Sequence, residues 1–289
     1  GFDEARTTIE NNIRSTFNVA WVMLEHAPRC HLIKLGTMGE YGTPNIDIEE
    51  GWIDVSHRGR TQRFLYPRQG GSLYHTTKIM DTDLLWFYVR THGLRVTDLM
   101  QGPVYGVSTD ESAMDPQLGI NFYYDNIFGT VVNRFIAQAV AGIPLTVYGA
   151  GKQIRGFINI RDTIQCVKLA AATPAEPHEL RVLNLFTEVF SLNEVAAKVK
   201  AAAKRVGLEV SFRHVANPRD EAEEHYYKPA NDGLLRLGLK PHLMTEQALV
   251  GMMEMVRPHQ HRIDHSKIVP RVRWDRATAG KDGAGEEGD

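Results

Sequence analysis

In the first hundred residues, segments whose apolar residues have helical spacing are followed by short apolar segments typical of strands. In residues 4–27 they recur three or four positions apart, which predicts a helix. Residues 31–35 are then predicted as a strand, residues 72–92 as a second long helix, and residues 94–99 as another strand. Strands that alternate with amphipathic helices favour a parallel, doubly wound α/β sheet of the Rossmann kind.

The segment between the first strand and the second helix has a different pattern. Residues 38–71 are loop-like, and two short apolar segments, 51–55 and 62–65, flank His57-Arg-Gly-Arg60. This arrangement predicts a hairpin or flap.

Past Gly129 a smaller α+β region is expected. A helix over residues 131–141 precedes a strand over 144–148, and Gly149-Ala-Gly151 is interpreted as a hairpin turn before a strand over 155–160. Asp162 is expected to be the N-cap of the next helix. Further strand-like or helical segments are expected at residues 181–186, 191–206 and 209–214.

These elements suggest three regions. Residues 1–128 would form the C-terminal part of a Rossmann domain with its active-site helix, residues 129–274 mainly a substrate domain, and residues 275–289 a Gly-rich, acidic, disordered tail.

Composition removes several classes of function. A net charge of −2 gives no footprint for nucleic acid or a membrane surface. No apolar run is long enough to span a bilayer. The two cysteines are isolated and the histidines lack HExxH-like spacing, so no metal site is expected. A GxGxxG turn that follows a strand, with an acidic residue about 20 positions further on, would hold a dinucleotide, and no segment fits that pattern.

Tyr74 and Lys78 are the first candidates for chemistry. A spacing of four places them one turn apart on one face of the predicted helix. An ammonium beside a phenol favours the phenolate, so such a pair can accept a proton from a hydroxyl whose carbon loses hydride. The spacing alone often arises by chance. Thr37, which ends the preceding strand, adds a hydroxyl that could bind the same substrate oxygen, and this arrangement resembles that of extended short-chain dehydrogenases/reductases.

A more specific resemblance rests on several segments in order. Within that superfamily the chain resembles the UDP-sulfoquinovose synthase family, in segments that cover nearly the whole sequence: 34–50 (KLGTMGEYGTPNIDIEE), Tyr74-His75, 98–102 (DLMQG), 145–149 (LTVYG), Arg155-Gly156 and 217–227 (NPRDEAEEHYY). The family normally carries a glycine-rich βαβ half before this point. The resemblance therefore implies a chain truncated at its N-terminus, and NAD as cofactor.

The resemblance also implies a reaction. C4 of UDP-glucose is oxidised with NAD⁺, the 4-ketone acidifies the C5 proton, the C6 hydroxyl is eliminated, sulfite adds at C6, and C4 is reduced again. Tyr74 is expected to be the C4 base, Lys78 to lower its pKa and bind the nicotinamide ribose, and Thr37 to orient the C4 oxygen. Glu40 and His75 are both candidates for proton transfer at C5 and C6, with their roles undivided.

The residues after Thr37 depart from a sister family. Nucleotide-sugar 4,6-dehydratases usually have Asp-Glu there, whereas this chain has Met38-Gly39 with the carboxylate displaced to Glu40. The departure disfavours a plain dehydratase, and Gly39 is expected to leave room for sulfite. Without the resemblance, Glu40 would be interpreted as a solvated loop carboxylate.

The nucleotide end of the substrate needs cations and a flat slot for uracil. Arg155 and Arg219 can fork onto phosphate oxygens. The segment Thr146-Val-Tyr148 resembles an edge strand whose backbone binds uracil, and Gln101 ends a predicted strand, where open α/β sheets bind ligands. Without the resemblance, both arginines would be interpreted as ordinary surface residues.

Two alternative functions remain at this point. One is a UDP-sugar 4-epimerase or decarboxylase with the same Tyr–Lys pair, and the other is a nucleotide-sugar-binding module without catalysis. The resemblance further implies UDP-glucose and sulfite as partners, a possible homodimer through a four-helix bundle, and a bacterial cytoplasm or a plastid stroma as the compartment.

Overall fold

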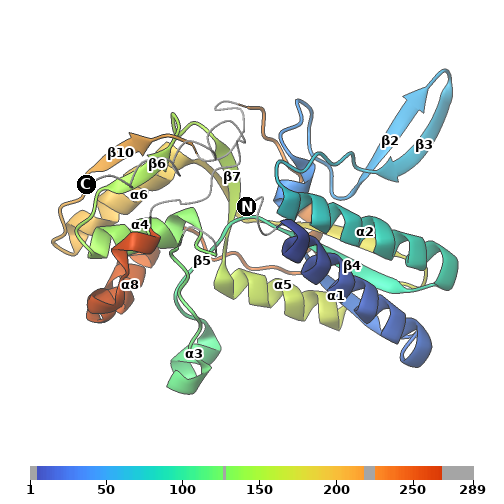
Figure 1. The fold of residues 1–289 in the computed structure, drawn as a ribbon, viewed down its shortest axis with the longest axis horizontal. Helices are drawn as coiled ribbons and strands as arrows, with labels where there is room; N and C mark the ends of the chain where they lie inside the picture. Colours follow the sequence, from blue (N-terminus) through green and yellow to red (C-terminus); the bar gives the residue numbers. More distant parts are fainter. Residues whose placement is uncertain (1–4, 126–127, 218–224, 269–289) are drawn as a thin grey trace, which may run out of the picture.

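A computed structural model describes residues 5–125, 128–217 and 225–268 (Figure 1). The α-helices are α1 (Ala5–His26), α2 (Leu73–His92), α3 (Asp110–Met114), α4 (Val131–Val140), α5 (Ile160–Ala172), α6 (Leu192–Arg205), α7 (Asp232–Arg236) and α8 (Glu246–Val256). The strands are β1 (His31–Thr37), β2 (Trp52–His57), β3 (Arg60–Leu65), β4 (Arg95–Gln101), β5 (Val104–Tyr105), β6 (Leu145–Tyr148), β7 (Ile154–Asn159), β8 (Leu180–Leu185), β9 (Glu188–Ser191) and β10 (Phe212–Val215). Short 3₁₀ helices are η2 (Met38–Tyr41), η3 (Pro116–Leu118), η4 (Arg257–Arg262) and η5 (His265–Lys267).

The central sheet is parallel and has the order β1-β4-β8. Thr37 at the end of β1 pairs with Gln101 at the end of β4, and Gln101 pairs with Leu185 at the end of β8. The carboxyl ends of all three strands therefore meet at one edge, which is where open α/β sheets bind their ligands. The predicted α/β fold with a parallel sheet is confirmed.

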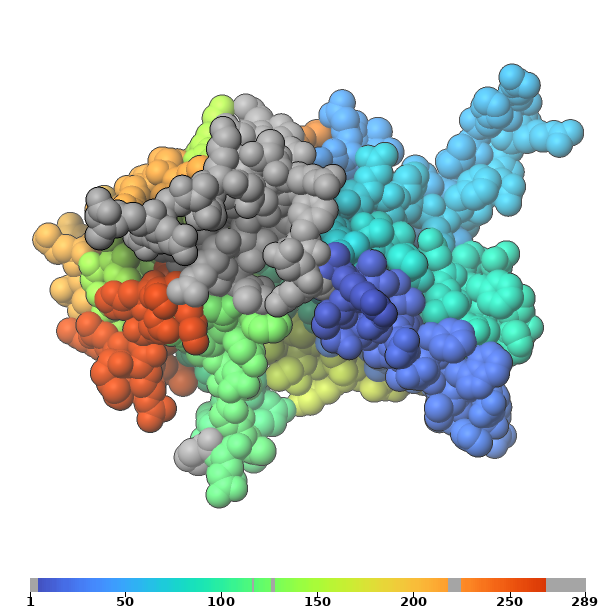
Figure 2. Space-filling view, in the orientation of Figure 1, coloured from blue at the N-terminus to red at the C-terminus, as the bar shows by residue number. Residues whose placement is uncertain are grey.

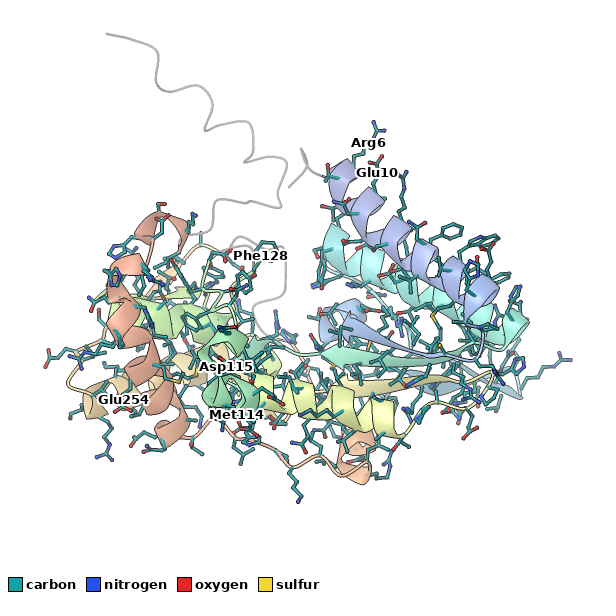
Figure 3. The ribbon with its side chains drawn as sticks, turned by 90° about the horizontal axis from the view of Figure 1, so that it is seen from below. Arg6, Glu10, Met114, Asp115, Phe128 and Glu254 are labelled. Carbon is teal, nitrogen blue, oxygen red and sulfur yellow. The ribbon has the colours of Figure 1, made fainter. Side chains whose placement is uncertain are left out.

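Helices cover both faces of this sheet. Val96 and Met100 of β4 face the helix pair α1–α2, whereas Leu99 points into the apolar cluster on the α5 side. Figure 3 shows α1 and α2 side by side above the sheet, with α5 below it. This alternation along β4 is the pattern of a strand that is buried on both faces.

The α2 helix has a defined beginning and end. Ser72 is its N-cap and its hydroxyl accepts from the backbone N–H of His75, 3.2 Å away. Gly93 closes the helix in the left-handed conformation, at φ 72°. Both signals stand in the sequence, which explains why the predicted range is close to the observed one.

A second apolar core lies in the other half of the molecule. It joins α4, α6 and α8 to β6, and its largest buried side chains include Phe135, Phe157 and Leu145. The strand β8 comes from residues 180–185 yet completes the sheet of the first half, so the two halves share elements. The proposed division at residue 128 stays a prediction.

The predicted hairpin is confirmed. Strands β2 and β3 pair antiparallel, and the two residues between them, Arg58 and Gly59, both have positive φ (49° and 76°). Two positive φ values in a two-residue loop are typical of a type I′ turn. The hairpin projects from the rest of the surface (Figure 2).

Two local predictions are wrong. Gly149-Ala-Gly151 joins strands of different sheets, because β6 pairs with β10 and β7 with β5 and β9, so the turn closes no hairpin. The N-cap of α5 is Asn159, not Asp162, since the Asn159 side chain accepts from Arg161 N. Asp162 lies within the first turn and binds His242 instead.

The expected tail, residues 275–289, lies outside the described residues. Within the described ranges, no helix is both long and apolar enough to cross a bilayer.

Candidate active site

The helix α2 presents Tyr74 and Lys78 at the carboxyl edge of the sheet. Tyr74 is 44% exposed, and the Lys78 ammonium lies 6.0 Å from the centre of its ring. Lys78 also lies 3.8 Å from the buried Asp81 carboxylate, a distance that holds the ammonium only loosely. Its N–H groups can therefore turn toward a ligand hydroxyl.

The electrostatics of Tyr74 differ from the expected pattern. The pKa of its phenol is raised above the ordinary value, chiefly by burial and next by the Glu40 carboxylate. The Lys34 ammonium opposes this shift, and Asp81 adds to it. The net direction is thus upward, and the lysine that counters it is Lys34, which the sequence analysis did not select.

Thr37 marks the passage from β1 into the 3₁₀ helix η2. Its hydroxyl accepts from Gly39 N at 3.2 Å, and the Glu40 carboxylate accepts from Thr37 N at 3.3 Å, which together form a capping box. A hydroxyl that accepts one hydrogen bond still has its own hydrogen to donate. Thr37 can therefore donate to a substrate oxygen at the edge of the sheet, beside its register partner Gln101.

Glu40 lies beneath this edge and has no exposed surface. One carboxylate oxygen meets Lys34 Nζ at 3.3 Å, and the other meets Arg68 Nη1 at 3.1 Å. Desolvation raises the pKa of Glu40, while the nearby Lys34 opposes this rise. Of the two candidates for proton transfer, Glu40 is thus the one that is enclosed and already hydrogen-bonded.

His75 is the other candidate, and it is partly exposed next to Tyr74, with 5.6 Å between ring centres. Its imidazole packs directly on the backbone of Gly39. A Cβ added at Gly39 would overlap Nε2 of His75 and lie 2.6 Å from its Cε1. In this structure His75 occupies the space beside Gly39, and the expectation that Gly39 leaves room for sulfite stays a prediction.

The expected uracil strand is engaged on both sides. On one side β6 pairs with β10. On the other, Thr146 N donates to Gln138 Oε1 at 3.1 Å and Thr146 O accepts from Arg134 Nη2 at 3.3 Å. Val147 is fully buried, and the Tyr148 ring lies 4.2 Å from the Arg134 guanidinium. The Tyr148 side chain is thus the most accessible part of this segment.

Of the two arginines expected to bind the diphosphate, only Arg155 lies within the described residues. Arg155 lies on β7, next to Gly156, and Gly156 packs so closely on Gly102 that a side chain at position 102 would overlap its carbonyl. Arg155 therefore lies near the end of β4, with its Nη1 3.3 Å from His225 Nε2. Arg219 falls outside the described residues.

The structure thus brings most of the candidates together. Thr37, Glu40, Tyr74, His75, Lys78 and Gln101 share one edge of the sheet. Lys34, Arg68 and Asp98 are buried beneath them and were not among the residues predicted from the sequence. Lys34 and Asp98 could have been noticed in the sequence, because each is a charged residue inside a predicted apolar strand, as in His31-Leu-Ile-Lys34.

Fold and site together define a protein with a Rossmann-like parallel sheet and a Tyr–Lys pair at its carboxyl edge. The chain belongs to the NAD dependent epimerase/dehydratase family, whose sequence profile matches residues 1–185. It is 50% identical over 267 residues to the chloroplastic UDP-sulfoquinovose synthase of Spinacia oleracea, covering 92% of this chain. It is 42% identical over 275 residues to the UDP-sulfoquinovose synthase of Sulfolobus acidocaldarius, covering 94% of this chain and 70% of that protein. The chain spans only 55% of the length of the spinach protein.

Solved structures agree on the fold. A dTDP-glucose 4,6-dehydratase from Streptomyces venezuelae matches with a TM-score of 0.67 at 17% identity, over 91% of this chain and 70% of that one. A UDP-glucose 4-epimerase from Thermotoga maritima has the same TM-score and identity, over 89% and 72%.

The described residues fit one end of NAD. Tyr74 and Lys78 offer a phenol and an ammonium at the carboxyl edge of a parallel sheet, where a nicotinamide ribose can be hydrogen-bonded. Within residues 5–125, 128–217 and 225–268, no GxGxxG turn follows a strand to hold the pyrophosphate.

Proposed function

We propose that this chain is the catalytic part of a UDP-sulfoquinovose synthase, which converts UDP-glucose and sulfite to UDP-sulfoquinovose. The observation that carries the proposal is the turn after β1. Met38-Gly39-Glu40 stands where dehydratases usually have an Asp-Glu pair. In this turn the His75 ring packs against Gly39, and the Glu40 carboxylate is buried. High identity to two UDP-sulfoquinovose synthases supports the same conclusion.

The first step in this proposal is oxidation at C4. Tyr74 takes the proton of the C4 hydroxyl, and Thr37 donates a hydrogen bond to the same oxygen. Lys78 binds the nicotinamide ribose through ammonium N–H groups that Asp81 holds only loosely. Bound NAD⁺ would accept the C4 hydride and later return it, and its positive charge would favour the Tyr74 phenolate.

The later steps need a proton shuttle near C5 and C6. His75 is proposed for this role because its imidazole lies next to Tyr74 and is partly exposed. An imidazole exchanges protons readily near neutral pH. Removal of the C5 proton then allows the C6 hydroxyl to leave, and sulfite adds at C6.

The nucleotide end is proposed to extend from Gln101 toward β7 and β6. Arg155 would bind the diphosphate, together with Arg219 from outside the described residues. Because the Thr146 backbone is already hydrogen-bonded, the side chain of Tyr148 is the part of β6 proposed to contact uracil.

A homodimer through α1 and α2 completes the proposal. The exposed outer face of this helix pair carries apolar side chains: Phe17 at 42%, Trp21 at 49%, Met80 at 47% and Phe87 at 47%. Apolar side chains gathered on one face are typical of an interface. The compartment is proposed to be a plastid stroma, as for the chloroplastic spinach relative, or a bacterial cytoplasm.

The test joins this chain to a glycine-rich dinucleotide-binding half. The protein is incubated with UDP-glucose, NAD⁺ and sulfite, and the products are separated and weighed by mass spectrometry. A sulfonated UDP-hexose that forms only with sulfite is the expected result. Formation of UDP-galactose without a sulfonated product would identify an epimerase, and no turnover with retained UDP-glucose binding would identify a binding module.

A further inference from the structure

The residues beneath the catalytic edge form a buried cluster of four charges: Lys34, Glu40, Arg68 and Asp98. Their side chains are at most 7% exposed. Two are positive and two are negative, so the cluster is neutral when all four are ionised. Burying charges is costly unless each is paired and hydrogen-bonded, so a balanced set is the arrangement that an interior tolerates.

Lys34 is the centre of this cluster. Its ammonium meets Asp98 Oδ2 at 3.0 Å and Glu40 Oε1 at 3.3 Å. It also donates to two groups of α2, the Thr82 hydroxyl at 2.5 Å and the backbone carbonyl of Lys78 at 3.2 Å. The ammonium thus ties β1 and β4 to the turn of α2 that carries the Lys78 side chain.

Glu40 connects the same cluster to the other catalytic element. It accepts from Thr37 N at 3.3 Å, and its Oε2 lies 3.4 Å from the Thr82 hydroxyl. Its neighbour Gly39 supports the His75 ring. The η2 turn therefore cannot shift relative to α2 without breaking charged hydrogen bonds, which are worth more than neutral ones.

We propose that Glu40 is a positioning residue rather than a proton carrier, and that Lys34, Glu40, Arg68 and Asp98 act together to hold Thr37 and His75 in register with Tyr74 and Lys78. This inference rests on the proposed function, because it assigns a role within that reaction. An apolar cluster of equal volume would also join these elements, but it would not fix their register, since apolar contacts are not directional.

The test is a charge-rescue experiment. Glu40→Gln leaves the cluster with one excess positive charge, Lys34→Met leaves it with one excess negative charge, and the double variant restores neutrality. Hydrogen exchange of the segment 34–42, measured on the chain alone, should accelerate by about 10- to 100-fold in each single variant, the loss expected for a charged hydrogen bond. The double variant leaves no uncompensated buried charge, so it should exchange more slowly than either single variant, but still faster than wild type because the hydrogen bonds of Lys34 are lost.

Kinetics of the cofactor-complete protein give the second readout. Each single variant should slow C4 oxidation and sulfonation together, on the order of 10²-fold, as expected for misplaced catalytic groups. The double variant should recover part of that loss, because neutrality is restored while the hydrogen bonds of Lys34 are not. A proton carrier could not be rescued by removing a lysine.

The opposite pattern would overturn the proposal. If Glu40→Gln leaves exchange of the 34–42 segment and C4 oxidation unchanged, and only the 4-ketone accumulates, Glu40 carries a proton. Glu194→Gln is the matched control, because Glu194 closes a similar capping box on α6, far along the chain and largely exposed. It should change neither readout.

A replacement variant and a readout that is independent of activity complete the experiment. If Glu40→Gln does not fold, Thr82→Val removes the hydroxyl shared by Lys34, Glu40 and Asp98 without changing the net charge. It should produce the same pattern, and unchanged exchange would count against the proposal. The exchange measurement needs neither substrate nor cofactor, so a failure to form sulfonated product would contradict the proposed function and leave the positioning role to be decided by exchange.

Discussion

The substitution Gly39→Ala tests why a glycine stands two residues after Thr37. The glycine either lets the His75 ring pack against the backbone or leaves room for sulfite. An added methyl group would overlap Nε2 of His75 and lie 2.6 Å from Cε1 and 2.7 Å from Cδ2. These atoms are the far end of a side chain that can rotate, so the fold should adapt. Moving the ring off its preferred rotamer and repacking it should cost about 1–2 kcal/mol of unfolding free energy.

Activity should suffer far more than stability. Gly70 packs against the base of the same side chain, because a Cβ at Gly70 would lie 2.8 Å from His75 Cβ, so His75 makes room mainly by turning its ring away from Gly39. A shift of about 1 Å in a catalytic group can lower kcat by on the order of 10²-fold. We expect that loss in kcat, with the KM for sulfite nearly unchanged.

The assay compares Gly39→Ala with Gly71→Ala in steady-state sulfonation and in urea unfolding. Gly71 is the control because a Cβ there would meet no atom within 4 Å. A wild-type kcat for Gly39→Ala would refute the role given to the packing of His75. A raised KM for sulfite at unchanged kcat would instead support the idea that the glycine leaves room for sulfite.

Three further predictions concern the same structure. Tyr74→Phe should lower kcat by about 10²–10⁴-fold, the usual worth of a proton-transfer group, while UDP-glucose binding measured by calorimetry stays nearly intact; a large loss of binding would assign Tyr74 a structural role. Gly36→Ala should destabilise the chain by about 3 kcal/mol or more in urea unfolding, because the new Cβ overlaps Asp98 Oδ1 and lies 3.1 Å from Glu40 Oε1. If Gly36→Ala is as stable as Gly71→Ala within error, the side chains of Asp98 and Glu40 can move aside at little cost, which would contradict this prediction. Hydrogen bonds from Ser191 hold the pKa of Glu194 below its ordinary value, so its contribution is present above the unfolded-state pKa and is lost as pH falls through the folded one. The difference in Tm between wild type and Glu194→Gln should therefore be present at neutral pH and vanish on acidification, and a difference that persists in acid would contradict this assignment.

The regular elements around the site could be predicted because their signals are local. Ser72 and Gly93 stand at the ends of an apolar periodicity, and both act as caps in the structure. The β2–β3 hairpin was equally accessible, since Arg58-Gly59 lies between two short strands.

Pairing between distant strands could not be predicted in the same way. The turn at Gly149 has the positive φ of a tight turn, yet β6 pairs with β10, more than sixty positions later. A local pattern contains no information about that partner. Asp162 illustrates the same limit, because its carboxylate is drawn to His242 rather than to the start of its own helix.

The sequence predicted the candidate residues at the edge of the sheet but not the charged residues buried beneath them. Tyr74, His75 and Thr37 follow from motif and spacing, and the fold places them together. The role of Lys34 depends on Asp98, which lies 64 positions away, and on Glu40, which looked like a solvated loop carboxylate until its burial was known. Buried charges acquire their meaning only from partners that tertiary folding supplies.

The most direct test of the central claim follows one atom through the reaction. The cofactor-complete protein is given UDP-glucose deuterated at C4, sulfite and NAD⁺, and the product is analysed by mass spectrometry and NMR. Oxidation and re-reduction at C4 in one active site predict a UDP-hexose with a sulfonate on C6 and deuterium retained at C4. A product without sulfonate, or a sulfonated product that has lost its deuterium, would contradict the account.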